Sequence, residues 1–277
     1  MQVKDINSCP TKSVRELDRQ LLYKMRETES NALARFDDLN VDVGESVWAY
    51  LQPAAKAALE KAIRDRGIRL FINSAYRTIA QQLILYNQYK TGRCGIEIAA
   101  PPGGSNHQSG LAIDIEDPEG WLPYLERYGW QWLGNSDRVH FDFVGNGIQD
   151  IRALAIEAFQ KLWNENNSTH FLKVDGVYGP MTEAHLNSAP AEGFAKGGKV
   201  DDIISSSKLR VLFLTQPIME GEDIRMLQQA LKKAEIDVAI DGFFGPATDL
   251  AVRKFQGLHS LAVDGKVGPG TRSKLGI

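Results

Sequence analysis

Apolar residues recur every three or four positions in several stretches of the N-terminal half of the chain. Residues 14–27, 53–66 and 78–90 show this spacing, which predicts three helices with one apolar face each. Gly67 directly follows the second stretch, and a glycine there is typical of a helix end. Residues 118–129 predict a fourth, shorter helix.

Apolar and polar residues alternate in residues 111–115 and again in residues 139–144, a pattern that indicates strands with one buried face. The apolar sets are Leu111, Ile113 and Ile115 in the first stretch and Val139, Phe141 and Phe143 in the second. If the two strands are neighbours, Asp114 and His140 lie side by side above an apolar layer. Helices that alternate unevenly with few strands predict an α+β domain.

The second half of the chain contains an internal repeat, the octapeptide D-G-x-x-G-P-x-T, which starts at Asp175, Asp241 and Asp264. An Asp-Gly turn, a second Gly and then Pro in a first helical turn predict a tight loop that starts a short helix. The first two copies each follow an amphipathic stretch, at residues 150–163 and 223–236. Repetition at this scale indicates a duplicated module.

Composition indicates more than one domain and excludes some classes of protein. The 277 residues suffice for about two domains of typical size. A net charge of −3 gives no reason to expect a nucleic acid as partner, and without a run of about 18 apolar residues we expect no membrane span. The N-terminal residues lack the apolar core of a signal peptide, so we expect another export route or a trimmed export segment. Cys9 and Cys94 either pair in an oxidising compartment or remain free thiols.

His107, Asp114 and His140 form a candidate metal site, although each taken singly is more often an ordinary polar residue. Two imidazoles and one carboxylate suit zinc, and three protein ligands leave the fourth tetrahedral position to water, as in catalytic sites. Such an ion lowers the pKa of its bound water to near neutrality. Glycines around His107, at positions 103, 104 and 110, allow its loop to fold back over the end of the strand.

The residues around this histidine form the pattern S-x-H-x-x-G-x-A-x-D. Its fixed positions are Ser105, His107, Gly110, Ala112 and Asp114. The pattern resembles the signature of the zinc D-Ala-D-Ala carboxypeptidases and of their relatives, the L-alanyl-D-glutamate endopeptidases of phage lysins. The resemblance covers residues ~45–145 and implies a hedgehog/DD-peptidase-like fold with helices on a small antiparallel sheet. It also implies one zinc ion per chain.

The same resemblance assigns roles to residues outside the ligand set. Arg77, in a segment that resembles the family's S-x-Y-R, would polarise the scissile carbonyl and stabilise its developing oxyanion. Asp137 stands three residues before the last histidine ligand, where the family carries its general base; Asp142 is its rival and otherwise a supporting carboxylate. The carboxypeptidase branch typically has Glu at this position, so the shorter Asp resembles the endopeptidase branch. Gln82 and Ser105 match positions that contact substrate.

The repeats resemble the small three-helix peptidoglycan-binding domain attached to many cell-wall hydrolases. The expected organisation is a catalytic domain at residues 1–146, a first module at 147–188, a linker rich in Ala, Gly and Ser at 189–208, and a second module at 209–277. The repeat residues mainly build turns and helix starts, so they identify no residue that contacts a glycan.

Together these features predict a monomeric zinc metallopeptidase that acts on peptidoglycan at the cell wall. The expected bond is the L-Ala-D-Glu bond of the stem peptide, and D-Ala-D-Ala trimming is the alternative. An alternative of another class is a wall-binding protein whose zinc is structural. Asp137 and Arg77 speak against it, because a structural site uses neither a base nor an oxyanion partner.

Overall fold

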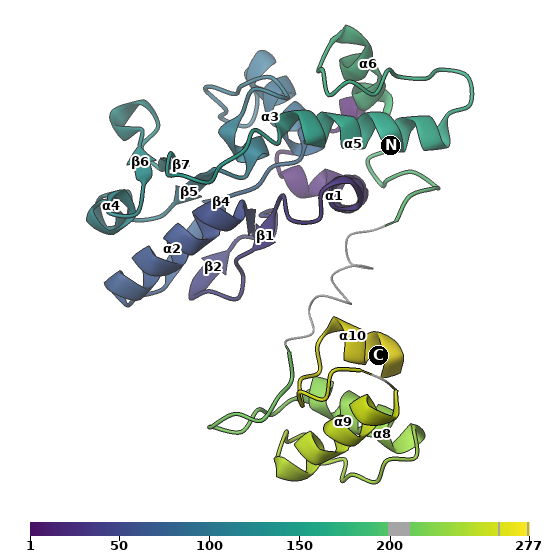
Figure 1. Ribbon diagram of the computed structural model, residues 1–277. Helices are drawn as coiled ribbons and strands as arrows, with labels where there is room; N and C mark the ends of the chain where they lie inside the picture. Colours follow the sequence, from purple (N-terminus) through teal and green to yellow (C-terminus); the bar gives the residue numbers. More distant parts are fainter. Residues whose placement is uncertain (199–210, 260, 276) are drawn as a thin grey trace. The chain divides into compact units, whose positions relative to one another are not determined.

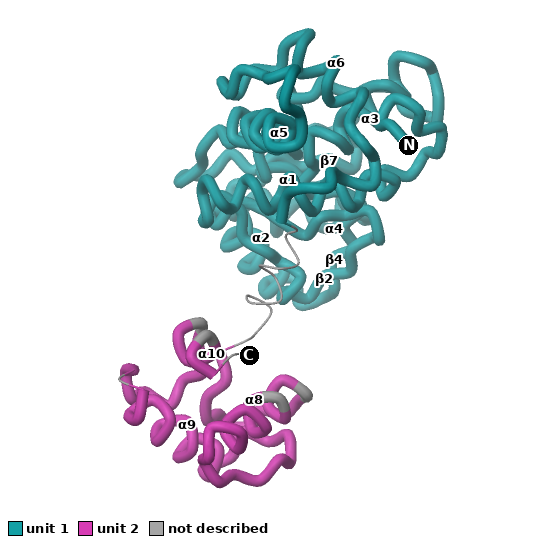
Figure 2. Tube along the Cα trace, turned by 90° about the vertical axis from the view of Figure 1, so that its right-hand side faces the viewer, with its two compact units in different colours: residues 1–200 teal, residues 201–277 magenta. Residues whose placement is uncertain are grey.

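The computed structural model describes residues 1–198, 211–259, 261–275 and 277. The chain divides into two compact units, residues 1–200 and 201–277 (Figure 2). None of the helices in the described residues is long and apolar enough to cross a membrane.

Unit 1 is built on a five-stranded sheet with the strand order β2-β4-β5-β7-β6. The strands are β2 (Val41–Val43), β4 (Leu70–Ser74), β5 (Ala112–Ile115), β6 (Trp130–Trp132) and β7 (His140–Phe143). The expectation of an antiparallel sheet is wrong for one pair: β2 and β4 are parallel, and the other neighbours are antiparallel. A helix separates β2 from β4 in the chain, and such a crossover is what parallel pairing requires. A separate antiparallel pair joins β1 (Ala34–Arg35) to β3 (Tyr50–Leu51).

The four helices expected in the N-terminal half are present in unit 1 (Figure 1). They are α1 (Arg15–Thr28), α2 (Pro53–Arg66), α3 (Ile79–Lys90) and α4 (Pro118–Glu126). Gly67 ends α2 with a φ of 73°, a left-handed conformation that glycine adopts without a Cβ clash. Short 3-10 turns complete this part of the fold: η1 (Val3–Asp5), η2 (Thr11–Val14), η3 (Asn106–Ser109) and η4 (Gly134–Ser136).

One face of the sheet carries the main apolar core, against α2 and α4. Ile113 and Phe141 are fully buried there, together with Leu59 of α2 and Trp121 of α4. The expected alternation therefore holds along β5 and β7. It fails for Val139, which precedes β7 and is 41% exposed.

Residues 147–198 belong to unit 1 and contain two helices, α5 (Arg152–Asn166) and α6 (Pro180–Ser188), where a three-helix module was expected. α5 packs along α1, as Figure 1 shows. The start of the expected linker is also held there, because Gln20 of α1 exchanges hydrogen bonds with the backbone of Phe194. The rest of that linker, from residue 199, lies outside the described residues.

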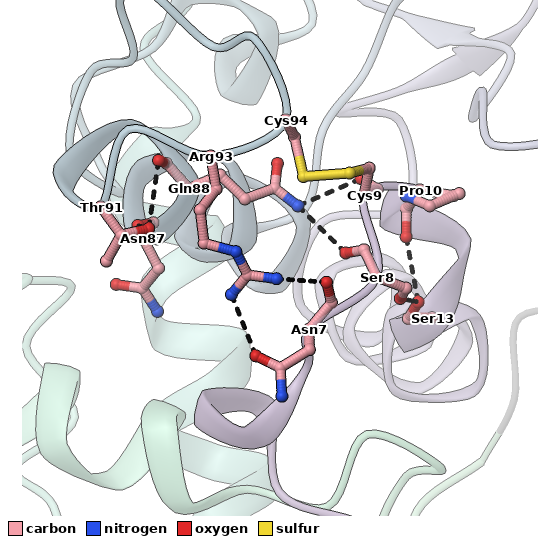
Figure 3. Close-up of a disulfide and its surroundings, with 10 residues drawn as sticks. All are labelled: Asn7, Ser8, Cys9, Pro10, Ser13, Asn87, Gln88, Thr91, Arg93 and Cys94. Atoms are coloured by element: carbon pink, nitrogen blue, oxygen red, sulfur yellow. Dashed lines mark hydrogen bonds between the residues drawn. A yellow bond between two sulfur atoms is a disulfide. The ribbon is translucent and has the colours of Figure 1, made fainter.

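Cys9 and Cys94 form a disulfide, with their Cα atoms 5.5 Å apart (Figure 3). The sequence left pairing and free thiols open. The structure joins the N-terminal segment to the loop after α3. Gln88 of α3 strengthens this junction, since its side-chain amide donates to the carbonyls of Ser8 and Cys9.

Unit 2 is a small helical domain of α8 (Glu222–Lys233), α9 (Pro246–Leu258) and α10 (Pro269–Leu275). Its core includes Leu227, Phe244 and Phe255, all buried. The third copy of the octapeptide follows a helix too, namely α9. The expected three-helix architecture is thus present in the second module.

All three octapeptides are tied to the preceding helix by one glutamine: Gln160, Gln228 or Gln256. Each glutamine accepts from the backbone N–H of the repeat's first Gly and donates to the repeat's Asp and Thr side chains. The repeat is therefore a helix-to-loop clamp that recurs three times.

Asp18 of α1 is a carboxylate buried completely inside unit 1. The indole Nε1 of Trp48 and the hydroxyl of Thr78 both donate to it. Burial raises the pKa of Asp18 to about 7, against these hydrogen bonds and the charge of Arg15, which lower it.

We expect Asp18→Asn to flatten the pH dependence of stability. Between about pH 4 and pH 7 the folded chain holds a proton that the unfolded chain has lost, so the free energy of unfolding falls as the pH rises. Over this window the loss is on the order of 3–4 kcal/mol, and it levels off above pH 7. All five tryptophans lie in unit 1, so urea titrations followed by tryptophan fluorescence report this unit. Asp38→Asn, at a carboxylate that is 63% exposed, is the control; equal slopes in both variants contradict the prediction.

Candidate metal centre

The sheet register brings two of the three candidate ligands together. In the antiparallel pair of β5 and β7, Asp114 lies directly opposite His140. Side chains of such a pair project from the same face of the sheet, here the face away from the main apolar core. His107 comes from η3, the turn just before β5. The side-by-side arrangement expected from the alternating pattern is confirmed.

The three ligand atoms have spacings that suit a tetrahedral zinc ion. His107 Nε2 is 3.2 Å from His140 Nδ1, and Asp114 Oδ1 is 3.3 Å from the first and 2.9 Å from the second. Ligand atoms about 2.0–2.1 Å from a tetrahedral zinc are about 3.3 Å apart. Among the described residues, this is the group of His, Cys, Asp and Glu side chains whose ligand atoms converge closely enough for a metal. The residues present therefore fit zinc.

Hydrogen bonds fix how both imidazole rings face the cluster. His107 Nδ1 is 2.7 Å from the carbonyl oxygen of Ala75, and His140 Nε2 is 2.9 Å from Asp142 Oδ1. A ring nitrogen that donates to an oxygen leaves the other nitrogen with a lone pair directed at a metal. Asp142 thus lies on the far side of the His140 ring, which is the place of a supporting carboxylate.

Arg77 holds the outer oxygen of Asp114. Its Nη2 donates to Asp114 Oδ2 at 2.8 Å, while its Nε donates to Ser74 Oγ at 2.9 Å. The carboxylate is therefore oriented with Oδ1 toward the histidines. The Arg77 side chain is 21% exposed, and its expected oxyanion role stays a prediction.

The electrostatics of the site favour a cation. Burial acts to raise the pKa of Asp114, but the His107 and His140 rings and Arg77 outweigh it and hold this pKa well below its usual range. Burial acts to lower the pKa of His140, yet hydrogen bonds to Asp114 and Asp142 raise it to about 9. Burial and the charge of Arg77 lower the pKa of His107. A zinc ion would take the place of the His140 proton, so its binding would release a proton and would tighten as the pH rises.

Asp137 lies at the open side of the cluster. Its Oδ2 is 3.9 Å from His140 Nδ1, the nitrogen that faces the other ligands, and the side chain is 41% exposed. The backbone N–H of His140 donates to the carbonyl of Asp137, which closes a tight turn and returns the carboxylate toward the ring. Asp137 and Asp142 therefore stand beside different nitrogens of one imidazole.

Gln82 of α3 and Ser105 are both buried, and Ser105 belongs to residues 101–110, the segment that contains His107 and is here called the metal loop. Gln82, 1% exposed, donates from Nε2 to the carbonyl of Ala100, and the Ser105 hydroxyl accepts from the backbone N–H of His107. Both therefore shape the metal loop. Their contact with a substrate stays a prediction.

Two groups that orient the site were not identified from the sequence. Ser74 begins the S-x-Y-R segment, so the motif itself offered the signal for its bond to Arg77. The carbonyl of Ala75 offered none, because any residue supplies a carbonyl and only the fold directs it at His107.

Two family matches agree with this geometry. Residues 49–144 match the family described as D-alanyl-D-alanine carboxypeptidase, and residues 220–275 match a putative peptidoglycan binding domain. The chain thus carries a zinc D-Ala-D-Ala carboxypeptidase-like domain followed by a peptidoglycan-binding domain, which confirms the resemblance drawn from the S-x-H-x-x-G-x-A-x-D pattern.

Two curated relatives are similar to parts of this chain. N-acetylmuramoyl-L-alanine amidase CwlL of Bacillus licheniformis is 34% identical over 114 residues, 38% of this chain and 31% of the relative. Zinc D-Ala-D-Ala carboxypeptidase of Streptomyces albus G is 45% identical over 58 residues, 20% of this chain and 23% of the relative. The chain covers less than a third of the length of these relatives. Among solved structures, the LdcB LD-carboxypeptidase matches 41% of this chain and 68% of its own, with 22% identity and a TM-score of 0.35.

We expect His140→Ala to abolish zinc binding, because it removes one of the three ligands and one of the three groups that pair with the Asp114 carboxylate. The purified wild-type chain should contain about one zinc ion by elemental analysis. His170→Ala, at an exposed histidine outside the cluster, should retain the metal. Equal zinc content in the two variants would remove His140 from the ligand set.

Proposed function

We propose that this chain is a zinc-dependent peptidase that hydrolyses the stem peptides of peptidoglycan at the cell wall. One observation carries the proposal: beside the cluster of His107, Asp114 and His140 stands an exposed carboxylate, Asp137, that is outside the ligand set. The match of residues 220–275 to a peptidoglycan-binding domain favours peptidoglycan as the polymer on which the chain acts.

The site residues divide the chemistry between them. Zinc, when bound by the three ligands, would supply Lewis-acid activation of water and of the scissile carbonyl. Asp137 accepts the proton of the attacking water and then delivers it to the leaving amine. Arg77 stabilises negative charge that develops on the carbonyl oxygen. Asp142 keeps the His140 ring in the ligating orientation.

We further propose the L-Ala-D-Glu bond as the target. The short Asp137 side chain resembles the endopeptidase branch, and a wall-binding domain suits an enzyme that works on assembled polymer. D-Ala-D-Ala trimming is the second candidate, favoured by the family description that matches residues 49–144. An endopeptidase needs a cleft that is open on both sides of the metal, whereas a carboxypeptidase needs a group that holds the terminal carboxylate.

Mass spectrometry of digests of a muramyl pentapeptide decides between these bonds. We expect release of a peptide that begins with D-Glu. Loss of a single terminal D-Ala, with the rest of the stem still attached to the muramyl lactyl group, would show carboxypeptidase specificity instead. A substrate left intact by zinc-loaded protein would overturn the peptidase proposal itself.

Asp137→Asn should retain zinc and lose activity by at least ~100-fold, since an amide cannot accept the proton. Asp142→Asn is the matched comparison. It should bind zinc about 10- to 100-fold more weakly but recover most of its activity when zinc is in excess. Zinc content and turnover, measured for both variants, assign the roles, and the reverse pattern would make Asp142 the base.

Deletion of residues 209–277 should reduce sedimentation of the protein with insoluble peptidoglycan. Cleavage of a small soluble stem peptide should stay nearly unchanged, because every proposed catalytic residue lies in unit 1 and the second unit only raises the local concentration at the wall. Equal loss on both substrates would make unit 2 part of the catalytic fold.

A further inference from the structure

Gln52 joins the metal loop to the segment after the sheet. It is 2% exposed and stands at the N-cap of α2. Its Nε2 donates to the carbonyls of Ser109 and Gln149, each at 2.7 Å, and its Oε1 accepts from the backbone N–H of Gln149 at 3.0 Å. Its own backbone N–H donates to the carbonyl of Gly110. A single buried side chain therefore bonds both to the turn that carries His107 and to the start of residues 147–198.

A second contact joins the metal loop to the same segment, further along the chain. A methyl group added at Gly103 would lie 3.2 Å from Ile156 Cδ1 of α5 and 3.4 Å from Tyr178 Cβ of the first octapeptide. Gly103 is in turn bonded to η3, since Gln108 Oε1 accepts from the backbone N–H of Gly103. Both α5 and the first repeat thus pack against the metal loop, which contains His107.

These contacts oppose those from the sheet side of the metal loop. There, the N–H of Arg77 donates to the carbonyl of His107, and the His107 ring bonds to Ala75. The turn is therefore held between β4 and its following residues on one side and residues 147–198 on the other.

We infer that Gln52 and residues 147–198 position the metal loop, so that this repeat-bearing segment is a working part of the metal centre. Gln52 is a positioning residue, because it acts through the backbone of η3 and bonds to none of the proposed ligand side chains. The inference rests on the proposed zinc site. Its test uses metal binding, which is measured without any peptide substrate.

The first test compares Gln52→Ala with Gln88→Ala in the full chain. Gln88 is also buried, and its amide also donates to two carbonyls, but these belong to Ser8 and Cys9 beside the disulfide. Both variants should lower the urea midpoint of the metal-free protein. Gln52→Ala should also weaken zinc binding about 10-fold in chelator competition and change the visible spectrum of the Co²⁺ form. Gln88→Ala should leave both metal readouts as in the wild type.

A second pair of variants probes the repeat itself. The Tyr178 hydroxyl is buried and has no hydrogen-bond partner among the described residues, so Tyr178→Phe preserves what the side chain contributes to packing. Tyr178→Ala keeps the Cβ that lies beside Gly103 but removes the ring that holds this residue in place. We expect several-fold weaker zinc binding for Tyr178→Ala and unchanged zinc binding for Tyr178→Phe. This comparison tests the inference even in the case that Gln52→Ala does not fold.

The outcomes separate this inference from the proposed function. The inference is overturned if Gln52→Ala binds zinc as tightly as Gln88→Ala does. It is also overturned if Tyr178→Ala binds zinc as tightly as Tyr178→Phe does. Either result leaves the peptidase proposal standing. A wild-type chain that binds no zinc overturns both.

Discussion

One largely buried carboxylate, Asp114, whose side chain is 13% exposed, determines the arrangement of the whole site. A buried negative charge is costly unless neighbouring groups compensate it, and here two imidazoles and a guanidinium do so. Each partner comes from a different element: His107 from η3, His140 from β7 and Arg77 from the turn after β4. The charge therefore ties three segments to β5. The same charge that would oppose folding without these partners makes the site suited to a cation.

The parts of the fold that follow from local pattern could be predicted from the sequence. A period of two along β5 and β7 sufficed to place Asp114 beside His140, because alternation decides which face each side chain takes. Helix spacing likewise gave α1 to α4. The parallel β2 was not foreseen, since a strand of three residues carries too little pattern and its direction depends on the crossover through α2.

The supporting shell of the metal centre was less predictable, for a physical reason. Gln52 acts on the backbone of residues 57 positions away, and the choice of carbonyl is set by tertiary packing. The octapeptide shows the same limit. Its local clamp is alike in all three copies, but the motif holds no signal that α5 packs on α1, and so the sequence favoured a separate module where the structure has one continuous unit.

The glutamine clamp separates what holds the octapeptide loop from what the loop displays. Its hydrogen bonds use the Asp and Thr side chains and the backbone of the first Gly and of the first variable residue, so the side chains of the two variable residues in the middle take no part in the clamp. The first variable residue faces solvent in every copy, as Val177, Phe243 and Lys266. The second turns inward: Phe244 and Val267 fill the core of unit 2, whereas Tyr178 packs beside the metal loop. The same backbone turn therefore leaves two side chains free to vary independently. The outward one changes the chemistry of the surface, and the inward one determines which neighbouring segment the loop packs against.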